Sequence, residues 1–187
     1  MSILTKFEIL ELIQKEDMIS GYLNLNHQLQ PNGFDLCVDN IYQYNDDGYI
    51  GWMDKRIPDY KPVEYFPNLG NMYFLQQGAY SFDILEIIKL PLDVCAVTIQ
   101  RSSIMRCGCI TNVGFWDSGY NGKGFSQLMV NNPYGLHIKK GANIIQMIFL
   151  KNTKETEGYN GSYQKEGINT EYNGLKRVLE KEVELIA

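Results

Sequence analysis

Hydrophobic positions along the chain follow two different spacings. In residues 5–19, apolar side chains recur at intervals of three and four, which predicts a short amphipathic helix that ends by Gly21. From residue 72 onward, apolar residues instead gather in short runs divided by Gly, Pro or Asn, as in strands joined by turns. These runs are MYFLQ, SFDILEIIKL, VCAVTIQ, CITNVGFW, GFSQLMVNN, GLHIKK and NIIQMIFLK.

A further strand is predicted in residues 30–44, where a Pro-Asn-Gly turn leads into a run rich in Val, Ile and Tyr. No long helical pattern separates the strands, which argues against a parallel βαβ sheet and favours an all-β barrel or jelly roll. Residues 45–72 are rich in turn residues and predict a loop-rich insertion with one short hairpin. The final stretch, LKRVLEKEVELIA, predicts a second helix, or an arm that packs on a neighbour.

The composition is that of one globular domain. The 187 residues are 44% hydrophobic and 21% charged, and no repeat or linker divides them. The net charge of −5, without a basic stretch, argues against nucleic-acid binding, although placed Arg side chains and backbone N–H groups can still hold a small phosphate ligand. The N-terminus lacks a signal-peptide pattern and no apolar run approaches the ~18 residues of a membrane span. We therefore expect a cytoplasmic protein without a membrane contact.

Four cysteines are too few for a disulfide scaffold. In an extended strand Cys107 and Cys109 face the same side and offer two ligands to one metal ion, but zinc needs two more. The other candidates are scattered singly: His27, His137, Cys37 and Cys95. We therefore predict buried free thiols, and the presence of only two histidines argues against His-based catalysis.

Four short motifs occur in order along the chain: NGFDL (32–36), QRSSIMR (100–106), VGFWDSGYNG (113–122) and KGANIIQMIF (140–149). Together they resemble the motifs of the dUTPase and dCTP deaminase superfamily. Its members carry G-Y/F-D-L, G-R-S-S/G-L-A, G-x-I-D-x-x-Y/F-x-G and G-x-R-I-A-Q-L, then a Gly/Tyr-rich C-terminal segment that closes over the nucleotide. EGYNGSYQKEGI (157–168) stands in the place of that segment, so the resemblance covers residues 30–168.

The resemblance implies a single dUTPase-like domain over residues 1–187, a distorted β-barrel or jelly roll with short N- and C-terminal helices. Its parts are a helix at about 5–19, a β core at about 30–150, and a C-terminal lid and helix at about 155–187. Family members are trimers with sites between subunits, so a homotrimer is implied as well. Gln100 and Asn143 depart from the motifs, which have Gly and Arg at these positions.

The serine motif offers anion donors. Arg101, Ser102 and Ser103 follow a predicted strand, and because glycines crowd residues 102–124 we expect a turn there and no helix. A guanidinium, two hydroxyls and free backbone N–H groups suit the oxygens of a triphosphate. The alternative is that Arg101 pairs with a surface carboxylate while the serines cap a turn. The resemblance favours phosphate binding.

Asp117 lies in a tight turn between aromatic residues. A carboxylate there can orient and deprotonate a water for attack on phosphorus, or it can be an ordinary turn residue. The resemblance implies the first role, or a contact with the deoxyribose 3′-OH. It also matches Tyr120 to an aromatic that packs on the sugar and discriminates against ribose.

The first and fourth motifs add two supporting residues. The resemblance implies that Asp35 supports a hydrated Mg²⁺ held by the phosphates and contacts the ion through water. Without the resemblance, Asp35 is equally an exposed residue after a turn. Gln146 matches the motif glutamine that contacts phosphate or the neighbouring loop.

The third motif also distinguishes the two reactions of the superfamily. Deamination of cytosine uses a Glu on the following strand, and here Gln127 stands at that position, where an amide cannot shuttle a proton. Arg106 nevertheless matches the deaminase branch. The chain therefore resembles a deaminase-type dUTP diphosphatase, as found among archaea and some viruses, with Arg106 and Gln127 in the catalytic group and the Gln127 amide available to the base edge.

In this interpretation the protein hydrolyses dUTP to dUMP and diphosphate by water attack on the α-phosphorus, with Asp117 as base or orienter and Mg²⁺ as cofactor. Uracil meets backbone groups at 110–114, with Thr111 and Asn112 beside them. The C-terminal segment closes as a lid with Tyr163 stacked on uracil and Gln164 or Lys165 near phosphate, or else it is a flexible glycine-rich loop.

Three alternatives stay open. A non-catalytic nucleotide-binding member of the same fold would keep Arg101 and Ser102 without turnover. A cupin-like metal protein would fit the strand pattern but needs a His-rich ligand set. A dCTP deaminase-like activity is opposed by Gln127.

Overall fold

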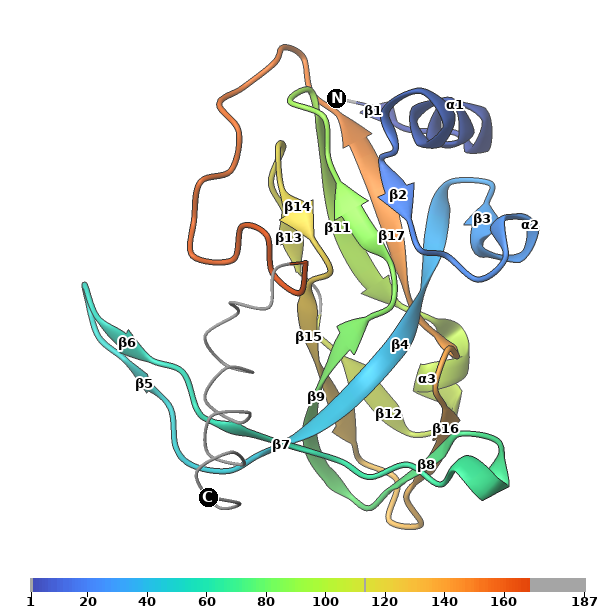
Figure 1. Ribbon diagram of the computed structural model, residues 1–187, viewed down its shortest axis with the longest axis vertical. Coiled ribbons are helices and arrows are strands. Elements are labelled where there is room, and N and C mark those ends of the chain that lie inside the picture. The colour runs from blue at the N-terminus through green and yellow to red at the C-terminus, as the bar shows by residue number, and fades with distance from the viewer. Residues whose placement is uncertain (1, 113, 169–187) are drawn as a thin grey trace, which may run out of the picture.

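The structure is a computed structural model, and it describes residues 2–112 and 114–168. Its centre is a curled antiparallel sheet with the strand order β12–β15–β9–β4–β17–β11–β13 (Figure 1). The prediction of an all-β barrel or jelly roll is therefore confirmed. In chain order these strands are β4 (Gly33–Tyr44), β9 (Gly78–Ile84), β11 (Val94–Gln100), β12 (Cys109–Thr111), β13 (Phe115–Trp116), β15 (Phe125–Val130) and β17 (Asn143–Lys151).

Shorter elements complete the fold. The edges of β17 and β4 are extended by β1 (Ser2–Ile3), β3 (Leu29–Gln30) and β7 (Tyr60–Pro62). Smaller sheets are formed by β2 (Ile19–Ser20) with β10 (Ile87–Lys89) and β14 (Asn121–Gly122), by β8 (Met72–Leu75) with β16 (Leu136–Lys139), and by β5 (Tyr49–Ile50) with β6 (Lys55–Arg56). The helices are α1 (Lys6–Glu16), α2 (Leu25–Gln28), α3 (Ser102–Arg106) and the 3₁₀ turn η1 (Pro67–Leu69).

The core lies within the curl of the main sheet. β4 is buried along most of its length, with β9 and β17 paired to its two edges. Along β17 and β16, buried and more exposed residues largely alternate, as expected of strands with one face on a core. The largest fully buried side chains include Phe34, Phe82 and Phe149.

The N-terminal helix is shorter than the pattern in residues 5–19 suggests. It ends at Glu16 because Asp17 adopts a left-handed conformation with φ 54°. Met18 and Ile19 then turn into the core, and β2 begins at Ile19. The expected C-terminal helix lies outside the described residues.

The expectation of no helix in residues 102–124 is wrong at its start. Ser102–Arg106 form the short helix α3, since the first glycine comes only afterwards, at Gly108, where φ is +74°. The prediction of buried thiols is right for three cysteines and wrong for Cys107, which is exposed where α3 ends. The insertion contains the predicted short hairpin, formed by β5 and β6.

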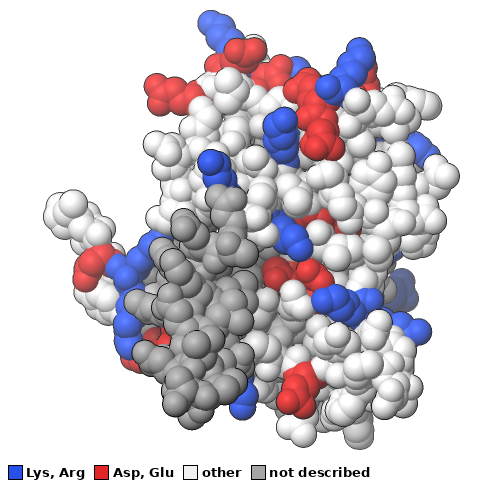
Figure 2. All heavy atoms as spheres, viewed as in Figure 1, with Lys and Arg blue, Asp and Glu red and all other residues white. Residues whose placement is uncertain are grey.

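Charge is mixed on the surface. On the face drawn in Figure 2, the described Lys and Arg side chains are interspersed with Asp and Glu and form no continuous basic groove. No described helix is long and apolar enough to cross a membrane.

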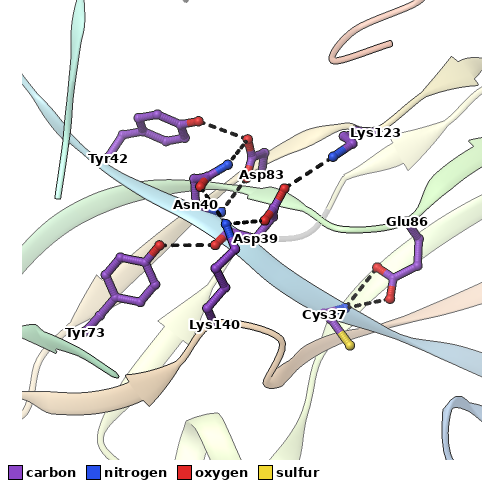
Figure 3. A network of polar contacts seen from close by, with 9 residues as sticks. All are labelled: Cys37, Asp39, Asn40, Tyr42, Tyr73, Asp83, Glu86, Lys123 and Lys140. Carbon is purple, nitrogen blue, oxygen red and sulfur yellow. Dashed lines mark hydrogen bonds and ion pairs between the residues drawn. The ribbon is translucent and has the colours of Figure 1, made fainter. Parts of the chain in front are cut away.

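A polar network holds β4 where its pairing with β9 shifts register (Figure 3). The shift places Asp39 and Asn40 in a bulge. Asp83 of β9 accepts a hydrogen bond from the Asn40 backbone N–H at 2.6 Å. Asp39 forms ion pairs with Lys140 at 2.6 Å and Lys123 at 3.2 Å, so the bulge is tied to two loops distant in sequence.

Glu86 is a fully buried carboxylate between β9 and β10 that also contacts β4. It accepts hydrogen bonds from the Cys37 backbone N–H at 3.0 Å and from the Gln28 amide at 2.6 Å. The same Gln28 amide also donates to the Asp35 carbonyl at 2.9 Å. Burial raises the pKa of Glu86, while these donors oppose the rise.

This raised pKa gives stability a definite pH dependence. The Glu86 carboxyl binds its proton more tightly in the folded state than in the unfolded chain, where its pKa has the ordinary value of 4.5. As pH rises above 4.5, ionisation of Glu86 therefore lowers the free energy of unfolding. Removing the titration with Glu86→Gln should make the unfolding free energy decline less steeply with pH, by at most about 1.4 kcal/mol per pH unit. Urea unfolding between about pH 4 and pH 8 measures the slope. The exposed Glu16→Gln is the control, and a Glu86→Gln curve parallel to the wild-type curve would contradict the assignment.

Candidate functional site

A cavity of about 360 Å³ lies between the turn after β13, strand β15, the insertion and the C-terminal segment. Three predicted site residues line it: Asp117, Tyr120 and Tyr163. The rest of the wall is largely aromatic and apolar, which suits a base and a sugar. It includes Ile57, Tyr60, Trp116, Phe125 and Tyr159.

Strand pairing explains why Asp117 and Tyr120 share one wall. Trp116 pairs with Ala96 of β11, and the chain then reverses through Gly119, whose φ is +78°. The Tyr120 N–H donates to the Asp117 carbonyl at 3.1 Å and closes the turn. Asp117 remains exposed, while the buried Tyr120 ring stands perpendicular to the Trp116 ring at 5.0 Å.

A buried threonine fixes the backbone beside the cavity. The Thr98 N–H donates to the Gly114 carbonyl at 3.1 Å, and the Thr98 hydroxyl accepts from the Gly114 N–H at 3.1 Å. This pairing holds one end of the segment 110–114 that is predicted to contact the base. Thr111, in the same segment, is buried and donates its N–H to the Gln100 side chain at 3.1 Å, while Val113 lies outside the described residues.

Gln127 follows the lining residue Ser126 on β15 and does not itself line this cavity. Its amide is held on both sides, because Nε2 donates to the Tyr44 hydroxyl at 3.0 Å and Oε1 accepts from the Asn112 side chain. The Tyr44 hydroxyl also accepts from Ser81 at 2.9 Å. The structure therefore brings Gln127 and Asn112 together and fixes the orientation of the Gln127 amide.

A second group joins the first, second and fourth motifs. Gln146 of β17 pairs with Asp35 of β4, and its amide donates to the Asp35 carboxylate at 3.3 Å. Arg101 forms an ion pair with the same carboxylate at 3.3 Å. Asp35 is only 1% exposed, which excludes the solvent-facing alternative. Burial raises the pKa of Asp35, and the Arg101 charge opposes this rise.

The donors of the serine motif lie at the start of α3. Arg101 caps this helix, and Ser102 and Ser103 are exposed in its first turn. Arg106 is exposed in the last turn. None of these four residues lines the cavity that contains Asp117.

Strand β11 sets the distance between the two groups. Asp117 follows Trp116, which pairs with Ala96 near the start of β11, whereas Arg101 follows the last residue of β11. Strands rise about 3.3 Å per residue, so Asp117 and Arg101 are separated by about 20 Å along the strand. Within one chain the cavity is lined along β11 as far as Thr98, whereas Asp117 lies near the start of that strand and Arg101 follows its end.

The C-terminal segment 159–168 packs against the turn that follows β13 in the same chain. Gln164 contacts three backbone groups: Oε1 accepts from the Asn121 N–H at 2.8 Å, and Nε2 donates to the carbonyls of Gly119 at 2.9 Å and Tyr159 at 2.8 Å. The Lys165 N–H donates to the Asn121 carbonyl at 2.7 Å, and the Lys165 side chain is exposed. In this arrangement Gln164 serves as a clamp on β14.

Two aromatic side chains connect this segment to the cavity. Tyr163 lines the cavity, and Lys55 of the insertion donates to its hydroxyl at 3.2 Å and lies 4.7 Å from its ring centre. The buried Glu166 also lines the cavity, where its carboxylate accepts from the Tyr120 hydroxyl at 3.4 Å. The C-terminal segment thus forms part of the cavity wall.

Comparison with known proteins agrees with this arrangement. The family model described as dCTP deaminase-like matches residues 3–152. The chain belongs to the dCTP deaminase-like family. This confirms the resemblance drawn from the four motifs.

Relatives of this dCTP deaminase-like chain carry a more specific name. A protein of Archaeoglobus fulgidus is 34% identical over 172 residues, which cover 91% of this chain and all of that protein. A protein of Methanosarcina mazei is 34% identical over 173 residues, which cover 90% of this chain and all of that protein. Both are named probable deoxyuridine 5′-triphosphate nucleotidohydrolase. A similar fold is found in the crystal structure of a 2′-deoxycytidine 5′-triphosphate deaminase from Agrobacterium tumefaciens. It superimposes with a TM-score of 0.62 at 18% identity, over 79% of this chain and 47% of that chain.

Several cavity residues of this dCTP deaminase-like chain carry no motif signal. Thr98 lies inside a strand and belongs to none of the motifs. Its role in positioning the cavity wall is seen only in its hydrogen bond with Gly114. Tyr60 of the insertion lines the cavity, and Lys55 of the insertion contacts the lining residue Tyr163. Tyr159 and Glu166 lie in the Gly/Tyr-rich C-terminal segment. The composition of that segment marks it as a candidate for the site but does not single out these two residues.

Gly124 offers a test of the cavity wall. Its φ is +75°, and a Cβ at this position would overlap the Trp116 ring. Gly124→Ala should therefore lower the unfolding free energy by about 2–4 kcal/mol, from backbone strain and overpacking together, and change the tryptophan emission of the folded protein. Gly78→Ala is the control, because the nearest atom to its Cβ is 3.7 Å away. Equal stability of the two variants would contradict the described packing.

Proposed function

We propose that the protein is a dUTP diphosphatase, a hydrolase that converts dUTP to dUMP and diphosphate. The names of its relatives support this function. The observation that carries it is the placement of Asp117 and Tyr120 on one turn in the wall of a largely aromatic cavity. A sugar ring packed on Tyr120 brings its 5′ side, and hence the α-phosphate, within the reach of this turn.

Asp117 is proposed to orient the attacking water and to accept its proton. Its carboxylate is exposed at the cavity wall, so a water molecule can reach it. Tyr120 is held by the Trp116 and Tyr159 rings, at 5.0 and 5.8 Å, and is therefore a rigid surface for the deoxyribose. A 2′-hydroxyl would lie unsatisfied against this ring, which favours dUTP over UTP.

The same geometry disfavours deamination. Gln127 stands where the related reaction uses a carboxylic acid, and its amide is fixed by Tyr44 and Asn112. An amide held in this way donates and accepts hydrogen bonds in fixed directions but transfers no proton. We propose that it contacts the base edge, together with Asn112 and the backbone near Thr111.

Phosphate binding is assigned to Arg101, Ser102 and Ser103, with Gln146 in support. The Asp35 carboxylate fixes Arg101, and the exposed serines and helix N–H groups offer further donors. Among the described residues no three His, Cys, Asp or Glu side chains gather as a metal cage. A Mg²⁺ would then be held by the phosphates and water, and Asp35 would support it through Arg101, because the Asp35 carboxylate is buried and binds Gln146 and Arg101. When bound, the ion would neutralise charge on the phosphates.

The distance along β11 supports a site shared between copies of the chain. Because Asp117 and Arg101 are about 20 Å apart along one strand, we propose that one copy provides the cavity and another provides Arg101, Ser102, Ser103 and Arg106. A homotrimer with three such sites satisfies this requirement with closed symmetry. We place the enzyme in the cytoplasm, where nucleotide metabolism would use it.

The C-terminal segment is proposed to close over the bound nucleotide. Tyr163 already lines the cavity and is assigned to stack on uracil. Gln164 is engaged with the backbone of its own chain, so the phosphate contact is assigned to the exposed side chain of Lys165.

Product analysis tests the reaction. Purified protein with Mg²⁺ should release dUMP and diphosphate from dUTP, little from UTP, and no dUTP from dCTP. Asp117→Asn should lower kcat about 10²-fold or more with a small change in KM, because it removes the proton acceptor and keeps the shape. The exposed Glu16→Gln should be unaffected. Deamination of dCTP would overturn the role of Gln127, and nucleotide binding without turnover would favour the non-catalytic alternative.

Mixing variants tests the shared site. Asp117→Asn and Arg101→Gln should each be nearly inactive alone, and Arg101→Gln keeps a donor to Asp35. Subunits unfolded together and refolded one to one should regain activity at about a quarter of the sites, since each needs an intact Asp117 from one copy and an intact Arg101 from the next. A mixture no more active than its components would show that both residues serve within one chain.

A further inference from the structure

The insertion carries a hairpin that projects from the body of the protein (Figure 1). It is formed by β5 and β6, with Tyr49 opposite Arg56 and Ile50 opposite Lys55. We call the segment Tyr49–Arg56 the arm. In the described part of the chain the arm pairs with no other strand, and a two-stranded hairpin alone is marginally stable in water.

The tip of the arm carries large apolar side chains, which are unusual in a solvent-exposed turn. The Gly51 N–H donates to the Asp54 carbonyl at 2.8 Å, which closes a turn with Trp52 and Met53 at its two corners. Trp52 is 96% exposed, Met53 85% and Ile50 78%. Turn corners in water are usually Gly, Pro, Asn, Asp or Ser, so large apolar side chains at this position indicate a surface that becomes covered.

The charged residues of the arm are Asp54, Lys55 and Arg56, all on its returning side. Figure 2 shows white, uncharged atoms at the end of the projecting segment, with acidic and basic side chains closer to the body. Arg56 forms an ion pair with Asp47 at 2.5 Å across the stem. The tip is therefore suited to an apolar partner surface rather than to an anionic one.

The root of the arm lies at the cavity. Lys55 contacts Tyr163, and Ile57 and Tyr60 line the cavity directly after the arm. The arm therefore joins the body of the protein at the wall of the cavity.

In the proposed assembly, another copy of this chain lies at the same cavity. The shared site requires a second copy to bring Arg101 and Ser102 to the cavity. Close to these residues in sequence stand three exposed apolar side chains, Ile99, Met105 and Ile110. The second copy thus presents apolar surface next to the donors that it delivers.

We propose that the arm docks on this second copy, with Trp52 and Met53 buried against apolar side chains around its α3. The inference rests on the proposed function, because the shared site is what brings the second copy to the arm. Docking stabilises the hairpin and holds the two halves of the site together.

The chain offers a direct reporter, because Trp52 and Trp116 are its only tryptophans. In a Trp116→Phe variant the emission comes from Trp52 alone. It should be blue-shifted and poorly quenched by iodide at high protein concentration, and shift to the red on dilution as copies separate. Emission typical of water-exposed indole at every concentration would overturn the proposal. So would a blue shift that appears only with anionic phospholipid vesicles, since the partner would then be a membrane.

A second experiment avoids any change in the cavity. In the double variant Trp52→Ser/Met53→Ser, the dissociation constant of the oligomer should rise about 30-fold or more by sedimentation, as expected when a central interface Trp is lost. Tyr134→Ser is the control, because Tyr134 is 89% exposed on a different turn. An unchanged dissociation constant, or a wild-type protein that is monomeric throughout, would overturn the proposal.

Sedimentation is independent of turnover, so the two proposals fail separately. A wild-type oligomer that dissociates in the double variant but does not hydrolyse dUTP supports the arm and refutes the function. Hydrolysis by an oligomer that the double variant leaves intact supports the function and refutes the arm.

Discussion

Strand β11 pairs with β17 over seven residues, from Val94 to Gln100, and this register positions the functional residues at both ends of the strand. At one end β13 pairs with β11 and brings Asp117 to the cavity. At the other end the chain leaves the strand as Arg101, which reaches back to the buried Asp35. The rigid sheet therefore keeps the two groups apart, and the proposed assembly of copies follows from that separation.

Buried polar groups support both ends of this arrangement. Thr98 fixes Gly114 beside the cavity, and Gln146 and Arg101 satisfy the Asp35 carboxylate. Each buried donor or acceptor is costly unless it is paired, so these contacts also specify a single position for the neighbouring backbone. The sheet and the polar pairs within it position one wall of the cavity, and the turn after β13, the insertion and the C-terminal segment form the rest.

The sequence predicted the all-β class and most of the strands, because both depend on short-range patterns, although the run SFDILEIIKL is divided between β9 and β10. Short apolar runs bounded by Gly, Pro or Asn mark β9, β11 and β17 directly. Helix α3 was missed because composition over 23 residues hid a short segment that precedes the glycines. The roles of Thr98, Lys55 and Tyr60 depend on contacts between segments distant in sequence, and local patterns carry no such information. The clamp formed by Gln164 was likewise beyond prediction, because its partners are backbone groups.

The Gln164 clamp has a consequence for motion. Its amide contacts the backbone at Gly119, Asn121 and Tyr159 simultaneously, and the Lys165 N–H adds a fourth bond to the same stretch. Peeling the segment away one residue at a time would leave several of these groups unpaired at intermediate stages. We therefore expect the segment to detach as one cooperative unit, with amide hydrogens at Asn121 and Lys165 exchanging with solvent at a common rate.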